Sequence, residues 1–321
     1  MQKFDVVALG ELLVDFTENG MSGQGNTIFE VNPGGAPCNV LSMLQRLGKK
    51  TAFIGKVGND NFGRMLRDVV SEQGINTDNI IFDDDIHTTL AFVHTKEDGD
   101  RDFSFYRNPG ADMMLRKNEI NESLLENTKI FHFGTLSMTE EKIAETTKYA
   151  VEKSKSMGAV ISFDPNFRPP LWDDFEKAKE QIWYGISKCD VLKISDDEIQ
   201  FLTGEKDIDA GAHKILEKYE PALLCATKGK NGSTAYYKGK SFFADAFVRK
   251  DTVETTGAGD TFMACVLNSV LEKGLDNLTK SDVSSMLEFA SAASSIITTK
   301  RGALKVMPQR NDVMSFLNNY K

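Results

Sequence analysis

Glu254-Thr255-Thr256-Gly257-Ala258-Gly259-Asp260-Thr261-Phe262 is a run of small residues that leads through one acid into an apolar helical pattern. A Gly-Ala-Gly turn that opens a helix directs several backbone N–H groups at one point, where the helix dipole also favours negative charge. The stretch therefore predicts an anion-binding turn at the start of a helix. Gly274 is the expected end of this helix, whose apolar positions are Phe262, Ala264, Val266, Leu267, Val270 and Leu271.

Asp260 is the unusual residue of this stretch. A carboxylate beside an anion-binding turn repels the ligand that the turn attracts, so binding alone does not account for it. If a phosphoryl group lies there, Asp260 is placed to take the proton from a hydroxyl group that attacks it. The alternative is a helix N-terminal acid that satisfies free N–H groups. The stretch by itself leaves both interpretations open.

The overall composition excludes several classes of protein. The chain has 321 residues, 40% of them hydrophobic, enough for one large α/β domain with an appendage or for two domains. A formal net charge of −9 argues against nucleic acid as a partner. The sequence has no signal-peptide pattern and no run of roughly 18 apolar residues for a membrane. Four widely separated cysteines predict reduced thiols in a cytoplasmic protein, and the four histidines lack metal-ligand spacing.

Strand and helix patterns alternate along most of the chain, which predicts a mostly parallel sheet covered by helices. The apolar run at 4–10 is the first buried strand, and 51–57 with 61–73 reads as a strand followed by a helix. The alternation resumes at Lys129. Further strands are expected near 130–134, 159–164, 190–194 and 222–227, with helices near 139–157, 175–188, 196–202, 210–219 and 281–299.

Two segments interrupt this alternation and predict a small separate sheet. Residues 88–94 and 102–107 read as strands joined by a polar loop at 95–101, and Arg107 ends the second strand. Residues 17–27 are polar and glycine-rich, and read as a loop. We expect a β-sheet lid formed by 12–34 and 87–112, inserted into an α/β core formed by 1–11, 35–86 and 113–321.

Polar residues follow several predicted strands, where open α/β sheets place their ligands. Asp15 comes shortly after the first strand, although an ordinary turn acid would look the same. Gly34 and Gly35 let a ligand approach the backbone, and Asn39 offers a donor and an acceptor to sugar hydroxyl groups. Arg168, followed by two prolines, is placed either to bind phosphate or to make a surface ion pair.

The glycine-containing turn Thr227-Lys228-Gly229-Lys230-Asn231-Gly232 suits a nucleotide phosphate or ribose. The common nucleotide motifs are absent. No Gly-x-Gly-x-x-Gly follows the first strand, and Gly239-Lys240-Ser241 lacks the earlier glycine of a Walker A loop. There is also no Gly-x-Ser-x-Gly nucleophile elbow. A phosphoryl-transfer enzyme of this sequence must therefore bind phosphate in another way, and the turn at 256–260 is the available candidate.

Two stretches together resemble the signatures of the ribokinase-like (PfkB) family of carbohydrate kinases: Pro33-Gly34-Gly35-Ala36-Pro37-Cys38-Asn39-Val40 and Thr255-Thr256-Gly257-Ala258-Gly259-Asp260-Thr261-Phe262. The resemblance covers essentially the whole chain and implies a three-layer α/β/α domain with a small β-sheet lid. The finer pattern is similar to bacterial fructokinases, in Gly10-Glu11-Leu12-Leu13-Val14-Asp15-Phe16, Asp164-Pro165-Asn166-Phe167-Arg168 and Ser195-Asp196-Asp197-Glu198. It implies ATP- and Mg²⁺-dependent phosphorylation of a sugar, expected to convert fructose to fructose 6-phosphate.

The resemblance also implies a role for each matching position. Asp260 is the base, the backbone N–H groups of Gly257, Ala258 and Gly259 form an anion hole, and Arg168 contacts transferred phosphate or substrate. The implied sugar-binding residues are Asp15, Gly34, Gly35, Asn39 and Arg107. The implied ATP-site residues are Lys193, Thr227, Gly229, Gly232 and Thr256, while Asn166 and Glu198 position Mg²⁺ through water.

Two positions depart from the family pattern. Glu254 stands where many relatives have Asp, a position associated with a monovalent cation, so potassium dependence stays open. Ser195 stands where ribokinases have Asn, which favours a fructokinase. One alternative is a 2-keto-3-deoxygluconate kinase, whose substrate carboxylate Arg107 and Arg168 would bind. Another is a non-catalytic sugar- or nucleotide-binding regulator, which would gain nothing from the charge of Asp260. The short amphipathic lid strands also predict a homodimer through the lid.

Overall fold

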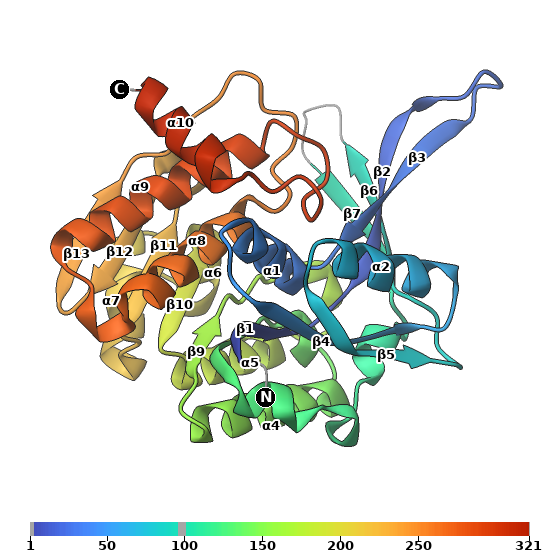
Figure 1. Cartoon of the computed structure of the whole chain (residues 1–321), viewed down its shortest axis with the longest axis horizontal. Coiled ribbons are helices and arrows are strands. Elements are labelled where there is room, and N and C mark those ends of the chain that lie inside the picture. The colour runs from blue at the N-terminus through green and yellow to red at the C-terminus, as the bar shows by residue number, and fades with distance from the viewer. Residues whose placement is uncertain (1–2, 96–100, 321) are drawn as a thin grey trace.

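One large sheet forms the centre of the molecule (Figure 1). The computed structural model of the chain describes residues 3–95 and 101–320. The strands of this sheet are β1 (Phe4–Leu9), β4 (Thr51–Gly58), β5 (Asn76–Asp83), β8 (Thr128–Phe133), β9 (Val160–Phe163), β10 (Val191–Ser195), β11 (Leu223–Thr227), β12 (Ser233–Tyr237) and β13 (Lys240–Ala244). Their order is β13-β12-β11-β10-β9-β8-β1-β4-β5, and the pairs β11–β12 and β12–β13 are antiparallel whereas the other pairs are parallel. The predicted mostly parallel sheet is confirmed.

Helices cover both faces of this sheet. One face carries α1 (Ala36–Arg46), α2 (Asn61–Glu72), α8 (Ala258–Lys273), α9 (Lys280–Ile297) and α10 (Arg310–Tyr320). The other face carries α3 (Glu122–Glu126), α4 (Glu141–Ser156), α5 (Phe175–Lys188), α6 (Asp196–Thr203) and α7 (Ile208–Tyr219). Short 3₁₀ turns connect them at η1 (Ala111–Met114), η2 (Lys117–Glu119), η3 (Leu136–Met138), η4 (Pro169–Leu171), η5 (Gly229–Asn231) and η6 (Leu275–Asn277).

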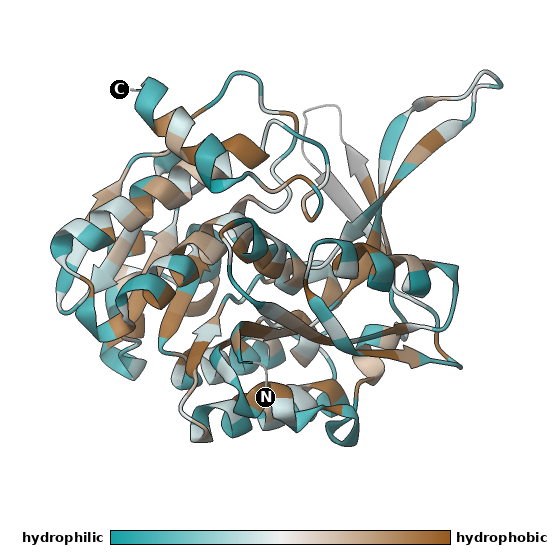
Figure 2. Cartoon of the chain, viewed as in Figure 1, coloured by the Kyte–Doolittle hydropathy of each residue, from teal (hydrophilic) through white to brown (hydrophobic). Residues whose placement is uncertain are grey.

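Burial on both faces explains the unbroken apolar strands. In β1, Val6 and Ala8 belong to the core cluster under α1 and α8, whereas Val7 and Leu9 belong to the cluster under α4 and α5. Parallel strands covered on both sides have this composition. Figure 2 shows the same division, with hydrophobic strands inside and hydrophilic outer helix surfaces. Across the described residues, every helix is too short or too polar to traverse a bilayer.

A second, smaller sheet lies beside the first. Its strands are β2 (Leu13–Met21), β3 (Thr27–Gly34), β6 (Leu90–Thr95) and β7 (Arg101–Tyr106), in the order β3-β2-β6-β7. The β2–β3 hairpin extends past the helical layers at one corner of the molecule (Figure 1). The two strands predicted from 88–107 are confirmed, and most of the loop predicted between them, at 96–100, lies outside the described residues.

Several elements differ from the sequence prediction. The loop predicted at 17–27 is wrong, because β2 continues to Met21 and β3 begins at Thr27. Backbone pairs such as Glu18↔Phe29 hold these polar strands together, so no apolar alternation marks them. The strand β5 and two helices, α3 with only five residues and α10, were not predicted. β5 lies at the edge of the sheet and begins with polar residues, and α10 buries only Val313 completely, which leaves a weak pattern for each.

Candidate active site

A cavity of about 930 Å³ opens between the carboxyl ends of the central strands and the small sheet. Ligands of open α/β sheets bind at this edge. The small sheet contributes Asp15, Thr17, Asn32, Gly34, Val93 and Phe105 to its lining. The α/β core contributes Glu11, Asn39, Asn166, Arg168, Lys193, Glu254, Thr256, Gly257, Gly259 and Asp260, among others. Most of the residues predicted for the site therefore meet around one space.

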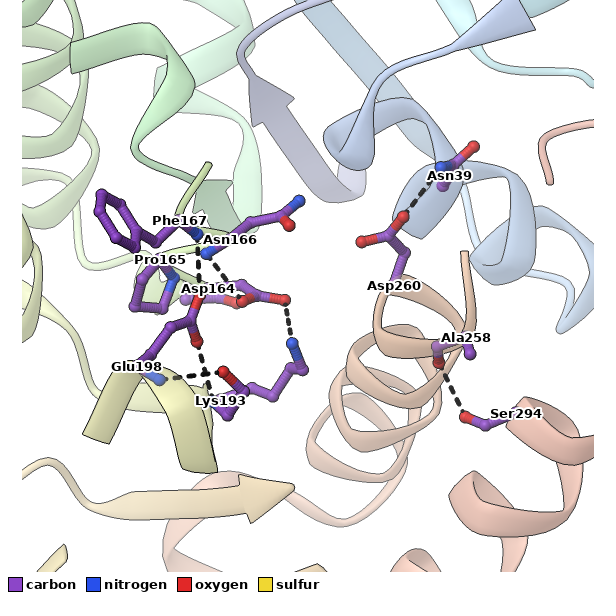
Figure 3. Close-up of polar contacts among 12 residues, drawn as sticks. Asn39, Asp164, Pro165, Asn166, Phe167, Lys193, Glu198, Ala258, Asp260 and Ser294 are labelled. Atoms are coloured by element: carbon purple, nitrogen blue, oxygen red, sulfur yellow. Dashed lines mark hydrogen bonds and ion pairs between the residues drawn. The ribbon is translucent and has the colours of Figure 1, made fainter. Parts of the chain in front are cut away.

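Asp260 lies in the first turn of α8, buried at the floor of this cavity. Its Oδ2 accepts a hydrogen bond of 2.8 Å from Nδ2 of Asn39, which comes from α1 (Figure 3). Burial raises the pKa of the Asp260 carboxyl group to about 6, although the Asn39 hydrogen bond lowers it. Near neutral pH the carboxylate is therefore populated, and its basicity is higher than that of an exposed aspartate.

The N-terminus of α8 is open towards the cavity. Gly257 is its N-cap with φ 76°, and no side chain caps the helix. The Ala258 N–H donates to the Thr255 carbonyl oxygen at 3.2 Å, whereas the N–H groups of Gly259 and Asp260 find no acceptor among residues 3–95 and 101–320. Of the three N–H groups predicted for the anion hole, that of Ala258 is thus already bound. Gly259, with the neighbouring Asp260 N–H, is left to bind an anion.

A cation and two acids lie across the cavity from Asp260. Lys193 in β10 makes an ion pair of 2.8 Å with Asp164, at the end of β9 (Figure 3). Burial lowers the pKa of Lys193, but the carboxylates of Asp164, Glu198 and Asp260 outweigh it and the net shift is upward. A Cβ atom on Gly259 would come within 3.1 Å of Lys193 Nζ. The ammonium group therefore lies next to the open end of α8.

Asn166 and Glu198 lie beside this pair. Glu198 accepts hydrogen bonds from the N–H groups of Phe167 (2.7 Å) and Ser195 (2.8 Å), the second within a capping box of α6. Asn166 has φ 46°, and its N–H donates to Asp164 at 3.2 Å. Within the described residues no three His, Cys, Asp or Glu side chains form a metal cage. This donor set fits Mg²⁺ that is held mainly by substrate phosphates and water.

Four of the predicted sugar-binding residues form the opposite wall, namely Asp15, Gly34, Gly35 and Asn39, and the two glycines have a steric role. A Cβ atom on Gly34 would lie 2.2 Å from Asp15 Oδ2, and one on Gly35 would lie 2.4 Å from the carbonyl oxygen of Glu11. Both glycines therefore let two chain segments pack together. Oδ1 of Asn39 is buried without a hydrogen-bond partner in the described structure. It is an acceptor that a ligand hydroxyl group can satisfy.

The predicted site residue Arg107 does not line the cavity. Its buried guanidinium group pairs with Asp112 at 2.7 Å and donates to Thr139 Oγ1 (3.0 Å) and the Leu136 carbonyl oxygen (2.7 Å). These contacts connect the end of β7 to the 3₁₀ turn η3 and the residue after it. In this structure Arg107 joins the small sheet to the core and is not among the residues that line the cavity.

Three of the predicted nucleotide residues also lie outside the cavity lining. Thr227 ends β11 beside Ser195, and Gly229 and Gly232 follow it. A Cβ atom on Gly232 would lie 2.3 Å from the Ala244 carbonyl oxygen, so close packing of β13 explains this glycine. Thr256 does line the cavity. Glu254 does so as well, and its Oε1 accepts a hydrogen bond of 3.1 Å from the Gly302 N–H.

The sequence pattern missed Glu11 as a site residue. Glu11 is 4% exposed and lines the cavity, two residues after β1. Burial raises the pKa of its carboxyl group to about 7, against the hydrogen bond that it accepts from the Ala36 N–H at 2.8 Å. An acid directly after a buried strand was the signal for it. Burial also lowers the pKa of His132 to about 3, so this histidine is neutral at physiological pH.

Comparisons with known proteins agree on one family. The profile of the pfkB family carbohydrate kinases matches residues 3–310. Probable fructokinase-2 of Arabidopsis thaliana is 41% identical over 314 residues, which span 97% of this chain and 95% of the relative. A fructokinase of Xylella fastidiosa, crystallised with bound ATP, has a TM-score of 0.91 at 31% identity, over 99% of each chain.

A double-mutant fructokinase of Vibrio cholerae O395 is also similar. Its crystal structure, which contains fructose, ADP and potassium ion, has a TM-score of 0.87 at 26% identity over 99% of each chain. These structures share the nine-stranded, mostly parallel sheet with helices on both sides and a small second sheet. The fold class expected from the sequence, a ribokinase-like three-layer α/β/α domain, is confirmed.

Proposed function

Because the chain belongs to the pfkB family of carbohydrate kinases, we propose that it transfers the γ-phosphoryl group of ATP to fructose and forms fructose 6-phosphate. The observation that carries this proposal is the geometry at Asp260. A buried carboxylate and an uncapped helix N-terminus lie in the same turn, facing Asn39 on one side and Lys193 on the other. The fructokinases among the relatives, one of them crystallised with fructose and ADP, support the choice of sugar.

In the proposed reaction Asp260 takes the proton from the attacking sugar hydroxyl group, whose oxygen forms the new bond to phosphorus. The bond from phosphorus to the bridging oxygen of ADP breaks, and ADP leaves with that electron pair. The Gly259 and Asp260 N–H groups, Lys193 and Arg168 stabilise the charge on the transferred group. Asp15 and the free Oδ1 of Asn39 bind other sugar hydroxyl groups. Backbone packing at Gly34 and Gly35 shapes this wall.

The nucleotide and the metal complete the proposal. Thr256 would lie along bound ATP, with Thr227, Gly229 and Gly232 at the neighbouring strand end. Mg²⁺ would neutralise the phosphate charge, held through water near Asn166 and Glu198, whose carboxylate already binds two backbone N–H groups. The potassium ion in the Vibrio cholerae enzyme supports a monovalent cation for this chain as well, and Glu254 is the position that we assign to it. Closure by the small sheet, 12–34 with 87–112, would keep water from the γ-phosphoryl group.

The competing substrate 2-keto-3-deoxygluconate has less support from the geometry. Its carboxylate was expected to need Arg107 together with Arg168. Only Arg168 lines the cavity, because Arg107 is held by Asp112, Thr139 and Leu136. A non-catalytic regulator is disfavoured by the buried Asp260, whose raised pKa shows that burial opposes its charged form.

Release of ADP by the purified protein tests this function. We expect the highest kcat/KM with fructose among fructose, 2-keto-3-deoxygluconate and ribose, in buffers with and without potassium. Asp260→Asn is expected to lower kcat by roughly 10²- to 10⁴-fold, because it removes the base, and to leave the Kd for ATP nearly unchanged. Asp68→Asn, at an exposed ion pair on α2, is the matched control. Full activity of the Asp260→Asn enzyme would contradict the assignment of the base.

We also propose that two copies associate through the small sheet. It exposes several large apolar side chains, namely Met21, Ile28, Val31 and Tyr106. We expect light scattering at micromolar concentration to give twice the chain mass of 35.6 kDa. Tyr106→Glu should shift the mass towards one chain, whereas Met157→Glu, at an exposed position after α4, should not. A single-chain mass for the unmodified protein would contradict the dimer.

A cytoplasmic location is part of the same proposal. Cys38, Cys189, Cys225 and Cys265 are all free and buried, as expected for a reducing compartment. Burial raises the pKa of each of these thiols, so they are expected to be unreactive.

A further inference from the structure

Glu11 is a buried acid that the proposed phosphoryl transfer does not use directly. It follows β1 and reaches the wall of the main cavity. It also lines a small second cavity behind Asp260, together with His132 and Asp164. Buried carboxylates are uncommon unless they bind something, so its contacts indicate what it does.

The contacts of Glu11 go to the first residues of α1. Its Oε1 accepts a hydrogen bond of 2.8 Å from the Ala36 N–H, one of the orphan donors of this helix. The N-cap residue Gly35 has no side chain to supply that bond. The backbone of Gly35 also packs so closely on Glu11 that a Cβ atom there would lie 2.4 Å from the Glu11 carbonyl oxygen. Glu11 therefore holds the start of α1 by its side chain and its backbone.

The same helical turn carries Asn39. The Asn39 N–H donates to the Gly35 carbonyl oxygen at 3.0 Å, and Asn39 lies one turn after Ala36 on the same side of the helix. Its Nδ2 donates to Asp260 at 2.8 Å. We propose that Glu11 is a positioning residue for the Asn39–Asp260 pair, because it holds the first turn of α1 through the Ala36 N–H. The proposal rests on the proposed function, in which Asp260 is the base.

The charges around the two acids determine the expected pH response. Arg107, directly after β7, and Asp112, in η1, interact with the charge of Glu11, and Cys38 lies near it in α1. Asp164, Lys193 and Arg168 face Asp260. The Asn39 hydrogen bond lowers the pKa of Asp260, against the effect of burial. A variant that displaces Asn39 should therefore raise that pKa and move the acidic limb of the rate profile to higher pH.

The test compares Glu11→Ala, Glu11→Gln and the control Asp207→Ala, which removes the N-cap of α7 far along the chain. The pKa of Asp260 is measured by ¹³C NMR of ligand-free protein with labelled aspartate, assigned with Asp260→Asn. We expect Glu11→Ala to raise this pKa, to lower kcat about 10-fold or more and to raise the sugar KM as well, because Asn39 also binds the sugar in the proposed reaction. Glu11→Gln keeps an oxygen for the Ala36 N–H and should restore all of these values, and Asp207→Ala should change none of them.

A double-mutant cycle with Asn39→Ala tests whether Glu11 acts on Asp260 through Asn39. If Glu11 acts through Asn39, Glu11→Ala should have little further effect on kcat or on the Asp260 pKa in the Asn39→Ala background. Three outcomes would overturn the proposal. Glu11→Ala could change kcat equally with and without Asn39, it could leave the Asp260 pKa unchanged, or it could raise the sugar KM without changing kcat. If Glu11→Ala does not fold, Glu11→Asp, which withdraws the carboxylate by one methylene, takes its place. The NMR readout needs no substrate, so it stands even if the protein phosphorylates a sugar other than fructose.

Discussion

The carboxyl group of Asp260 combines three conditions that are rarely met by one side chain. It is buried, it accepts a hydrogen bond from Asn39, and it lies in the first turn of a helix whose N-terminus has no side-chain cap. Burial raises its pKa and the hydrogen bond limits the rise, which leaves the group ionised at neutral pH but more basic than an exposed aspartate. A general base is most effective when its pKa lies near the working pH.

The pKa of Asp260 predicts the acidic limb of the rate profile. The base must be deprotonated, and its pKa is raised to about 6, so kcat/KM for the sugar should rise with pH, reach half of its plateau near pH 6 and level off roughly one pH unit higher. Asn39→Ala removes the hydrogen bond that lowers this pKa, so the acidic limb of this variant's rate profile should move to higher pH. Initial rates between pH 5 and 9 at saturating ATP check both statements. A profile that stays flat down to pH 5 would show that Asp260 does not limit the reaction.

At the scale of elements, the start of α8 is arranged for an anion. Gly257 takes the left-handed conformation at the N-cap, and Ser294 of α9 anchors the turn by donating to the Ala258 carbonyl oxygen at 2.8 Å. The N–H of Gly259 is left facing the cavity beside Lys193. A rigid turn with a cation next to it stabilises phosphate charge without reorganisation during the reaction.

The two glycines of this turn should respond differently to alanine. Gly259→Ala keeps a helical backbone and meets only the flexible end of Lys193, so the fold should survive while kcat/KM for ATP falls by about 10-fold. Gly257→Ala forces φ 76° on alanine and brings its Cβ within 2.6 Å of Ala303, so it should lose about 1–3 kcal/mol of unfolding free energy.

The control for this pair lies at the other end of the same helix. Gly274 has φ 83°, so Gly274→Ala carries similar backbone strain away from the cavity. It should lose stability in urea denaturation and keep its kcat/KM for ATP. Unchanged ATP kinetics for Gly259→Ala would argue against a phosphate at this turn.

At the scale of the whole molecule, the cavity exists because two sheets meet. The wall of the cavity that carries Asp260 and Lys193 comes from α8 and from the ends of β9 and β10. The facing wall comes from β2, β3 and α1. The small sheet returns to the core through Arg107, whose guanidinium group binds Asp112, Thr139 and the Leu136 carbonyl oxygen. Both ions of this pair are almost fully buried. We infer that this buried pair fixes the base of the small sheet.

Removal of Arg107 should therefore cost stability and change sugar binding little. Arg107→Ala leaves the Asp112 carboxylate buried without its cation, which is expected to lower the unfolding free energy by about 3–5 kcal/mol in urea denaturation. Arg67→Ala, at an exposed ion pair on α2, should change it by less than about 1 kcal/mol. If Arg107→Lys raised the KM for fructose many-fold without loss of stability, Arg107 would be a sugar ligand after all.

Much of this molecule was predictable because its signals are local. The apolar runs of β1, β4 and β8 to β11 mark strands buried on both faces, and the helices between them follow their periodicity. The glycine turn before α8 was predicted from residue type, although its residues alone left open whether Asp260 is a base or an N-terminal helix acid. Polar or edge segments carried no such signal, which is why the hairpin of β2 and β3, the strand β5 and the helix α10 were missed or misread.

Tertiary structure decided which polar groups meet. Asn39 and Asp260 are 221 positions apart, and only the packing of α1 beside α8 places their side chains in contact. Arg107 was predicted at the cavity, but Asp112 and Thr139 hold it in the core. Glu11 became a candidate only through its burial and its bond to Ala36. By itself the sequence determined most of the strands and helices and the glycine turn before α8, because these depend on neighbouring residues. The partners and the basicity of the buried charges depend on desolvation and on distant segments, so only the folded chain determines them.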